Sequence, residues 1–350
     1  MRFTIGVVFV KKKQYIKSFC LVVLILTYLL AFTGCQAPDH TDSSSSYDST
    51  GENPFSSNTQ NEESVMFAYG IGLEKPEGDM VYDGQPVNAE CFIDNVGPSM
   101  SVGLLIFIDG IPQPYKVGDH DETYMYIHEA PSMEKTTFPI SFTPVCGKKG
   151  ETKNIRFLSI LNPQIRPDKL EYDYGHTNAM TTFFPRRLEI KEDVPDVLPE
   201  YSQLPSQRDM TSEEIEQVIY TNSKGQQINK LNIFNLFVRD ANKSEQTAYI
   251  DVEEQKFTVE VQGFGGPSTK YILLPYLNHV LVNTDEFPGI LTVDEGKKIF
   301  RKTFTFELTK LDKDAYQLQK YNTFYMLAIP VSGDSQLDPK ISQSYVVGME

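Results

Sequence analysis

The clearest regularity along the chain is a two-residue alternation of apolar and polar positions. It is cleanest in "KTTFPISFTP" (135–144) and in "RKTFTFELTK" (301–310). Alternation with this period is typical of a β-strand that buries one face. Placed at a shift of 166 residues, the two segments match in three apolar pairs: Phe138 with Phe304, Ile140 with Phe306, and Phe142 with Leu308.

Further matches between the two halves of the chain follow in the same order. The shifts between matched segments are 170, 169, 166 and 167 residues, so they drift only by small loop insertions. This shared order predicts an internal duplication. The matched pairs are "VNAEC" (87–91) with "FTVEV" (257–261), the Gly-Pro-Ser turns at 97–99 and 266–268, "SVGLLIFIDG" with "TKYILLPYLN", and "NIRFLSILNP" with "YNTFYMLAIP", in which Pro163 aligns with Pro330.

Each unit is expected to contain roughly six or seven short strands, because turn residues recur about every 8 to 15 positions. Helical periodicity is nearly absent, and the one helix start is a capping-box pattern at 211–214 before "IEQVIY". The patterns predict an all-β protein with two tandem β-sandwiches whose strand spacing is Ig-like. We expect the sandwiches at residues 65–192 and 231–350, joined by a Pro-rich linker with a short helix at 193–230.

The N-terminal segment has a different pattern. A basic stretch, "KKKQYIK", precedes an apolar run that ends in "LAFTGC". The run has about 15 residues, which is typical of a secretory signal peptide and short for a membrane span of about 20. "FTGC" resembles the lipobox of bacterial lipoproteins. The resemblance implies that residues 1–34 are removed as a signal peptide and that Cys35 carries the lipid; an uncleaved membrane anchor is the alternative.

Composition and charge add a tether and exclude some partners. The segment 36–64 is dominated by Ser, Asp, Asn, Thr, Gln and Glu, so with Cys35 it is expected to form a lipidated, disordered tether (35–64). Removal of residues 1–34 takes five of the 32 basic residues and none of the 47 acidic ones, which leaves 27 against 47 and a net charge of −20. This charge argues against nucleic-acid binding and against docking flat on an anionic membrane.

Two cysteines remain in the part expected to fold, Cys91 and Cys146. Export permits a disulfide between them. Buried free thiols are the preferred interpretation, because an Ig-type strand order places the two cysteines apart while a disulfide needs Cα atoms within about 7 Å.

The search for catalytic chemistry finds no standard motif: the chain lacks a paired-histidine zinc pattern, a phosphate loop and a serine elbow. We therefore predict that the protein is not an enzyme and needs no cofactor. The segment "VGDHDETYMYIHE" (117–129) could bind a divalent metal if its arms met, but a solvated loop is the preferred interpretation and no metal is predicted. Its polar residues are Asp119, His120, Asp121, Glu122, His128 and Glu129.

A second polar segment, "RPDKLEYDYGHTN" (166–178), is the predicted binding loop. The corresponding segment of the second unit (331–340) is shorter and has no aromatic residue. Tyrosine offers contact area at a low entropic cost, as in recognition loops; the alternative is that these rings cover the end of the core. The candidate contact residues are Arg166, Tyr172, Asp173, Tyr174 and His176.

These inferences predict a lipid-anchored, extracytoplasmic protein that binds a protein, peptide or glycan through the end loops of a β-sandwich. Its lipid would hold it on the bacterial cell membrane, and we expect a Gram-positive plasma membrane. The chain has no Trp, so a glycan partner has no specific support. The alternatives are a solute-capturing lipoprotein of a transporter, a structural spacer, and an enzyme whose site is assembled only in space.

Overall fold

The computed structural model describes residues 69–75, 77–170, 183–195, 201–243, 247–331 and 337–349. All of them belong to one compact unit, Asn53–Glu350. Within these ranges no helix combines the length and the apolar character needed to cross a bilayer. The predicted signal peptide, Cys35 and the tether lie outside the described residues.

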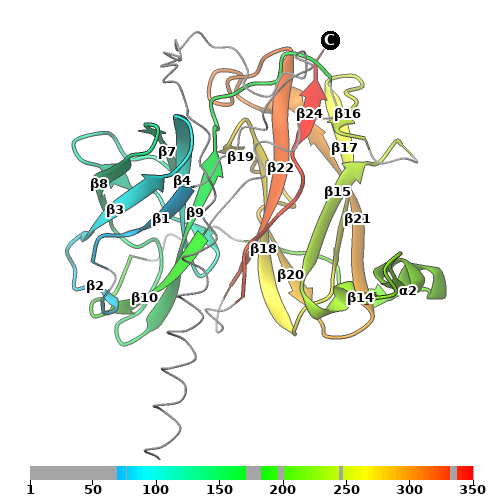
Figure 1. Ribbon diagram of the computed structural model, residues 1–350, viewed down its shortest axis with the longest axis horizontal. Coiled ribbons are helices and arrows are strands. Elements are labelled where there is room, and N and C mark those ends of the chain that lie inside the picture. The colour runs from blue at the N-terminus through cyan, green and yellow to red at the C-terminus, as the bar shows by residue number, and fades with distance from the viewer. Residues whose placement is uncertain are drawn as a thin grey trace, which may run out of the picture. The chain divides into compact units, whose positions relative to one another are not determined.

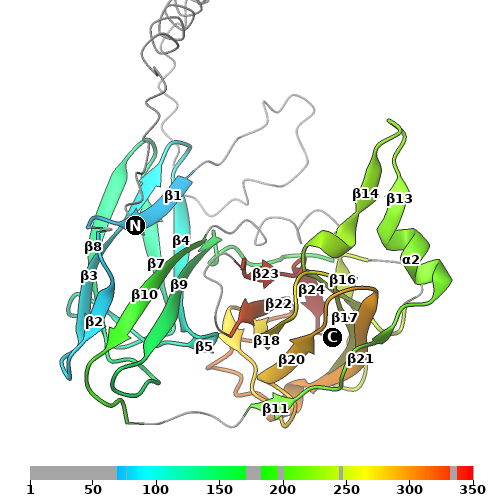
Figure 2. The ribbon, with the colours of Figure 1, turned by 90° about the horizontal axis from the view of Figure 1, so that it is seen from below.

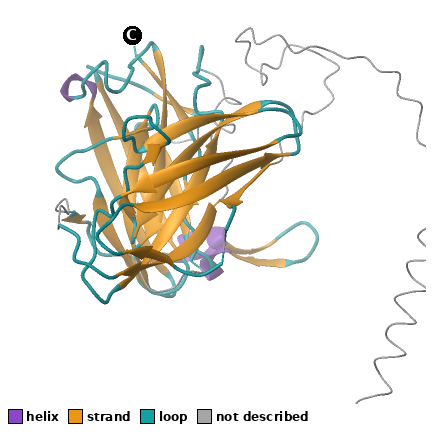
Figure 3. Ribbon diagram, turned by 90° about the vertical axis from the view of Figure 1, so that its left-hand side faces the viewer, coloured by secondary structure: helices purple, strands orange, loops and turns teal. Residues whose placement is uncertain are grey.

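The described chain is mostly β-strand, which confirms the all-β prediction (Figure 3). The first domain is a sandwich of two sheets, with β1, β3 and β8 in one layer and β4, β9 and β10 in the other (Figure 1). One sheet has the order β1 (Tyr69–Leu73), β3 (Val87–Asn95), β8 (Lys135–Phe142), β6 (Lys116–Val117). The other has the order β2 (Met80–Tyr82), β10 (Phe183–Ile190), β9 (Thr152–Leu161), β4 (Met100–Ile108), β5 (Ile111–Pro112), and β7 (Met125–Ala130) also pairs with β4.

The second domain repeats this arrangement. One sheet has the order β12 (Arg208–Asp209), β21 (Lys298–Glu307), β17 (Lys256–Phe264), β15 (Asn235–Asp240). The other has the order β11 (Ser202–Gln203), β20 (Gly289–Val293), β18 (Thr269–Leu277), β22 (Tyr321–Pro330), β24 (Tyr345–Gly348), β16 (Tyr249–Ile250). The short strands β19 (Val280–Leu281) and β23 (Lys340–Ile341) pair with β18 and β22.

The segment expected to be a linker carries the described α-helix, α2 (Ser212–Val218). Thr211 caps it: its hydroxyl accepts from Glu214 N–H while the Glu214 carboxylate accepts from Thr211 N–H, so the predicted capping box is confirmed. A hairpin of β13 (Ile219–Thr221) and β14 (Gln227–Asn229) follows and extends away from β17 and β21 (Figure 2). The same segment also supplies β11 and β12 to the two sheets of the second domain. Two 3-10 turns, Lys230–Asn232 and Leu308–Lys310, complete the helical elements.

The strand pairings of the two domains correspond one to one. The antiparallel pairs β1–β3, β3–β8, β4–β9, β4–β7 and β9–β10 match β15–β17, β17–β21, β18–β22, β18–β20 and β22–β24. The parallel pair of β2 with β10 matches that of β16 with β24. This order, A-B-E in one sheet and C-F-G in the other with a parallel strand beside G, is Ig-like.

The ladders correct the alignment of the two halves by two residues. Cys91 pairs with Phe138, and Val259 pairs with Phe304. If Phe138 is aligned with Phe304, Cys91 therefore corresponds to Val259 and not to Val261, with which the sequence pattern aligned it.

A second correction concerns β9. Aligning the Gly-Pro-Ser turns places Val102 at Tyr271, and their ladder partners are Leu161 and Pro330. Pro330 therefore corresponds to Leu161 and not to Pro163. Both errors are even numbers of residues, because a period of two determines which face a residue occupies but not its register.

Each sandwich closes over a core that follows the predicted alternation. Phe138, Ile140 and Phe142 are buried on β8, and Phe304 and Phe306 are buried on β21. The intervening side chains are exposed or half-buried, as half-buried strands require.

A third apolar cluster joins the two domains. It consists of buried side chains on the outer faces of β4 and β9 of the first domain and of β18 and β22 of the second. Burial of one such side chain contributes about 1.5–3 kcal/mol, so the domains are expected to move as one body. Four equivalent pairs contribute, which makes the contact quasi-symmetric: Leu105 with Leu274, Phe107 with Tyr276, Leu158 with Leu327, and Ile160 with Ile329.

Candidate functional site

The predicted binding loop begins at the junction of the two domains. Of its candidate contact residues the structure describes Arg166, whereas Tyr172, Asp173, Tyr174 and His176 lie outside the described residues. Arg166 donates from Nη2 to Oε1 of Gln317 at 2.9 Å. Gln317 belongs to the second domain, so the first residue of the loop is bonded across the junction.

The departure of the loop from the first domain is held by Asn162, which follows β9. Its Oδ1 accepts from Ser101 N–H at 2.9 Å, and its own N–H donates to Ser101 O at 2.7 Å. Asn162 has a φ of 46°, in the left-handed region that Asn tolerates better than most residues. The turn therefore fixes the direction in which the chain leaves the sheet.

A second contact lies four residues beyond Arg166. A Cβ added at Gly348 of β24 would lie 3.1 Å from Cδ2 of Leu170. The loop segment thus rests on the second domain at two points, Gln317 and Gly348, before the described chain stops at residue 170.

The acceptor Gln317 stands on a bonded support. Asn278, in the turn between β18 and β19, donates from Nδ2 to Tyr316 O at 3.0 Å and to Asn322 Oδ1 at 2.8 Å. Its Oδ1 accepts from Thr323 N–H at 2.9 Å. Because Asn278 is buried, these bonds are shielded from water and hold the Gln317 turn against β22.

His279 and Tyr325 form the buried polar pair beneath Arg166. His279 Nδ1 lies 3.1 Å from Tyr325 Oη, and the Tyr325 ring stacks on Tyr276 with centroids 5.3 Å apart. Burial lowers the pKa of His279 to about 3, and the charge of Arg166 lowers it further. Burial also raises the pKa of Tyr325 well above its usual value. Both groups are therefore neutral near pH 7, which suits a structural pair and not a general acid or base.

The polar segment 117–129 is divided between solvent and core. On β7, His128 is buried and stacks on Phe138 with ring centroids 3.6 Å apart. His120 lies outside, with Nε2 3.1 Å from Tyr126 Oη, and the Tyr126 ring lies between the two histidines. The carboxylates of the segment are exposed. Since strand alternation points His128 inward and its neighbours outward, no group of three His, Cys, Asp or Glu side chains in the described ranges could hold a metal ion.

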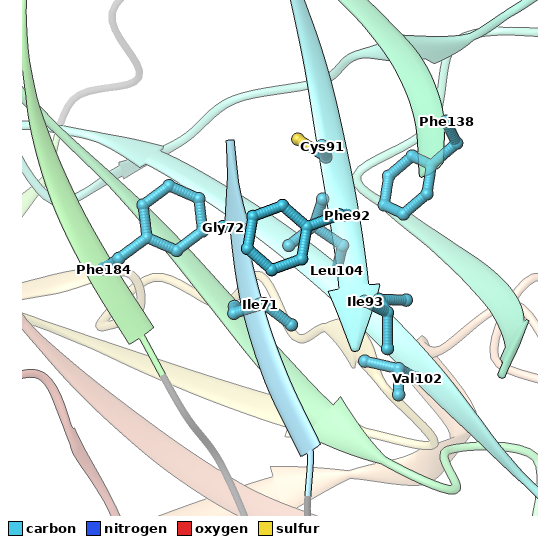
Figure 4. Close-up of a pocket in the computed structure, with 9 residues that line it drawn as sticks. All are labelled: Ile71, Gly72, Cys91, Phe92, Ile93, Val102, Leu104, Phe138 and Phe184. Carbon is cyan, nitrogen blue, oxygen red and sulfur yellow. The ribbon is translucent and has the colours of Figure 1, made fainter. Parts of the chain in front are cut away.

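A small cavity lies inside the first sandwich (Figure 4). Its volume is about 10 Å³, and its lining is apolar apart from the thiol of Cys91. This volume holds about one water-sized sphere, whereas sites for small molecules measure roughly 300–1,000 Å³. The lining residues are Ile71, Gly72, Cys91, Phe92, Ile93, Val102, Leu104, Phe138 and Phe184.

The two thiols are free and buried, which confirms the preferred interpretation of Cys91 and Cys146. Burial raises the pKa of Cys91 to about 12. A thiol with such a pKa is protonated near pH 7 and is a poor nucleophile, so Cys91 acts as an apolar core residue.

The sequence did not indicate Gln317, His279 or Leu170 as part of this region. The bond between Arg166 and Gln317 spans 151 residues, and no local periodicity reports such a pairing. One usable signal was present: the turn "LNHV" places Asn278 and His279 where the duplicated unit has Gly-Pro-free loop residues, and both have a positive φ, 50° and 68°.

Comparison with known proteins gives no family. No family model and no curated protein matches the chain. Among solved structures, the E. coli chaperone DraB is 9% identical, with 81% of this chain and 97% of that chain covered and a TM-score of 0.24. A Porphyromonas gingivalis W83 protein of unknown function is 9% identical, with 80% and 99% covered and a TM-score of 0.22. A Salmonella enterica SafA pilin–SafB chaperone complex is 9% identical, with 81% and 97% covered and a TM-score of 0.23. None of these likenesses supports a function for this chain.

Proposed function

We propose that the protein is a lipid-anchored, extracytoplasmic binding protein that recognises a protein, peptide or glycan through the loop 166–178. The observation that carries the proposal is the bond from Arg166 to Gln317, because it roots this Tyr-rich segment on both domains. A binding loop with a fixed base loses less conformational entropy when it meets a partner.

The composition of the loop supports contact with a macromolecule. Tyr172 and Tyr174 add two large amphipathic rings beside the charged or titratable side chains of Asp173 and His176. Rings of this kind bury a large area and keep a hydroxyl for hydrogen bonding. The second unit lacks the rings, so the two copies differ where a specific function would require a difference.

The anchoring part of the proposal rests on the N-terminal segment. Cleavage before Cys35 and acylation of its sulfur would leave two acyl chains on the protein, which hold it on a membrane far more firmly than one chain does. The acidic charge of the mature chain favours a hydrated position away from the anionic bilayer surface. We place the protein on the outer face of a bacterial cell membrane, of the Gram-positive type.

A solute-capturing role for a transporter receives no support from the cavity, which is too small for a solute. A structural spacer is the rival that the test must separate, because two domains packed as one body would also serve as a rigid post.

The test uses the full-length lipoprotein in lipid nanodiscs, screened against a displayed peptide library and a glycan array. The expected result is a ligand whose affinity falls about tenfold or more in the variant Tyr172→Ser/Tyr174→Ser. The matched control is Tyr220→Ser, since Tyr220 is an exposed tyrosine on the β13–β14 hairpin. Equal binding by both variants, or no ligand at all, would favour the spacer and contradict the proposal.

A further inference from the structure

The edge strands β7 and β20 are equivalent elements of the two domains. β7 pairs antiparallel with β4, and β20 pairs antiparallel with β18. In these ladders Gly103 faces Ile127 and Ile272 faces Ile290. The shift of 169 residues that aligns β4 with β18 places Gly103 at Ile272, so Ile127 corresponds to Ile290.

In the second domain the outer edge of β20 is occupied by another strand of the same chain. β11 runs parallel to β20, with Gln203 beside Ile290, and Leu204 N–H donates to Ile290 O at 2.9 Å. The Leu204 side chain enters the core of the domain and lies against Gly289, where an added Cβ would be 2.8 Å from its Cδ2. This edge of the fold therefore accepts a parallel strand and one apolar side chain.

In the first domain no strand within the described ranges pairs with the outer edge of β7. Tyr126 N–H donates to Tyr115 Oη at 3.0 Å, and Tyr115 Oη donates to Leu104 O at 2.7 Å, so the main chain of Tyr126 faces β4. Successive residues of a strand direct their N–H and C=O groups to opposite sides. The main-chain groups of Ile127 consequently face the outer edge, and its side chain is 38% exposed.

The side chains around this edge indicate the charge of the occupant. The exposed acidic residues on β7 and in its flanking turns are Asp119, Asp121, Glu122, Glu129 and Glu134. The nearby bases are fewer, and Lys135 is paired with Glu74 at 2.8 Å. Pairing of two β7 edges from two copies would place these acidic groups together, which is unfavourable. The charge therefore favours a basic segment over a second copy of this chain.

The ring of Tyr126 offers the apolar contact that such a segment needs. Tyr126 corresponds to Gly289, the residue against which Leu204 lies. Its half-buried ring stacks with His120 and His128, so an apolar side chain of an incoming strand would lie on an aromatic surface instead of entering the core.

We propose that the outer edge of β7 is a docking site for an extended, basic segment of a partner protein, which adds to the sheet as a parallel strand in the way that β11 adds to β20. Main-chain hydrogen bonds would supply the attachment, and the acidic flanks would select the charge. This site is distinct from the loop 166–178 and does not depend on it.

The test uses two synthetic peptides and the full-length protein in nanodiscs. The first peptide alternates valine and lysine; the second has the same sequence with N-methyl groups on alternate amides, so that its charge is equal but one edge cannot pair. We expect the first peptide to bind and to protect the Ile127 and Glu129 amides from hydrogen exchange, and the N-methylated peptide to bind at least about tenfold more weakly. Equal binding of both peptides, or protection elsewhere, would overturn the proposal.

Two variants refine the result. Ile127→Pro removes the outward N–H at an edge position where proline is tolerated, and should reduce binding about tenfold. Glu129→Lys leaves the backbone intact and should weaken the basic peptide while strengthening one that alternates valine and glutamate, which keeps the test decisive if the proline variant fails to fold. Protection of the same amides that depends on protein concentration, without peptide, would identify a second copy as the occupant and contradict the proposal. The variant Tyr172→Ser/Tyr174→Ser should bind the peptide unchanged, so that failure of the loop function and failure of this site are distinguishable.

Discussion

Arg156 of β9, fully buried, donates from Nη1 to the main-chain oxygen of Pro330 in β22 at 3.0 Å. The donor belongs to the first domain and the acceptor to the second. A buried hydrogen bond between domains has no water to replace it if it is broken. This bond and the surrounding apolar cluster make the junction part of the fold.

Replacement of this arginine should weaken the junction. In Arg156→Leu the Pro330 oxygen loses a buried donor, so we expect the free energy of unfolding to fall by about 1–3 kcal/mol in urea titrations. The control is Arg187→Leu, since Arg187 is exposed on β10 and its nearest carboxylate, that of Asp79, lies 3.7 Å away; its effect should stay below about 0.5 kcal/mol. Equal effects of the two variants would show that the bond across the junction contributes nothing special.

The quasi-symmetric cluster makes a prediction about matched substitutions. Leu158 and Leu327 occupy equivalent positions and are both buried at the junction. Leu158→Ala and Leu327→Ala should therefore each cost about 2–4 kcal/mol, and by similar amounts. Leu158→Asp should also separate the domains, which small-angle scattering would detect as an increased radius of gyration. An unchanged radius together with wild-type stability would contradict the tight junction.

The buried histidine on β7 predicts acid sensitivity. Burial lowers the pKa of His128 to about 4 from an ordinary value of 6.5. The unfolded chain therefore takes up a proton at a higher pH than the folded one. The stabilising contribution of neutral His128 is complete above about pH 6.5 and is lost as the pH falls toward 4, with an upper limit of about 3 kcal/mol.

The measurement is the slope of unfolding free energy against pH between 4 and 6.5. His128→Phe should flatten the slope relative to the wild type, whereas His120→Phe, at an exposed position, should leave it as it is. His279, whose pKa burial lowers to about 3, acts in the same direction in all three proteins and cancels in the comparison. A slope that His128→Phe does not change would refute the burial of this ring.

The thiols provide a prediction that concerns both the core and the processing. Cys91 and Cys146 are buried and free, so neither should react with a maleimide under native conditions. In urea the protein recovered from the membrane should show two reactive thiols, because Cys20 would leave with the signal peptide and Cys35 would be acylated. Rapid native labelling would contradict the burial of Cys91, and no labelling in urea would indicate a disulfide.

The alternation of side chains was sufficient to predict the strands of both domains but not their register. Phe138, Ile140 and Phe142 face the core as expected. A shift by two residues keeps every side chain on its face, so the pattern could not distinguish Val259 from Val261 as the counterpart of Cys91. Only the ladder, in which Cys91 pairs with Phe138 and Val259 with Phe304, resolves it.

The interaction of the loop base with the second domain could not be predicted for a different reason. Arg166 appeared in a promising loop, but its partner Gln317 lies in a turn of the other domain. Likewise, the residues of β11 carry no strand pattern of their own; they pair with β20 because Leu204 finds space beside Gly289. Contacts between distant segments depend on packing, which periodicity along the chain does not encode. The predicted contact residues Tyr172, Asp173, Tyr174 and His176, like Cys35, lie outside the described residues and stay predictions.

The display of these two sandwiches outside the cell on a lipid anchor is tested most directly by the intact mass of the protein recovered from its native membrane, beside a Cys35→Ala variant. We predict the mass of the chain from Cys35 to Glu350 plus acyl chains, and loss of that species in the variant. An unmodified, full-length mass for the wild-type protein would contradict the lipid anchor.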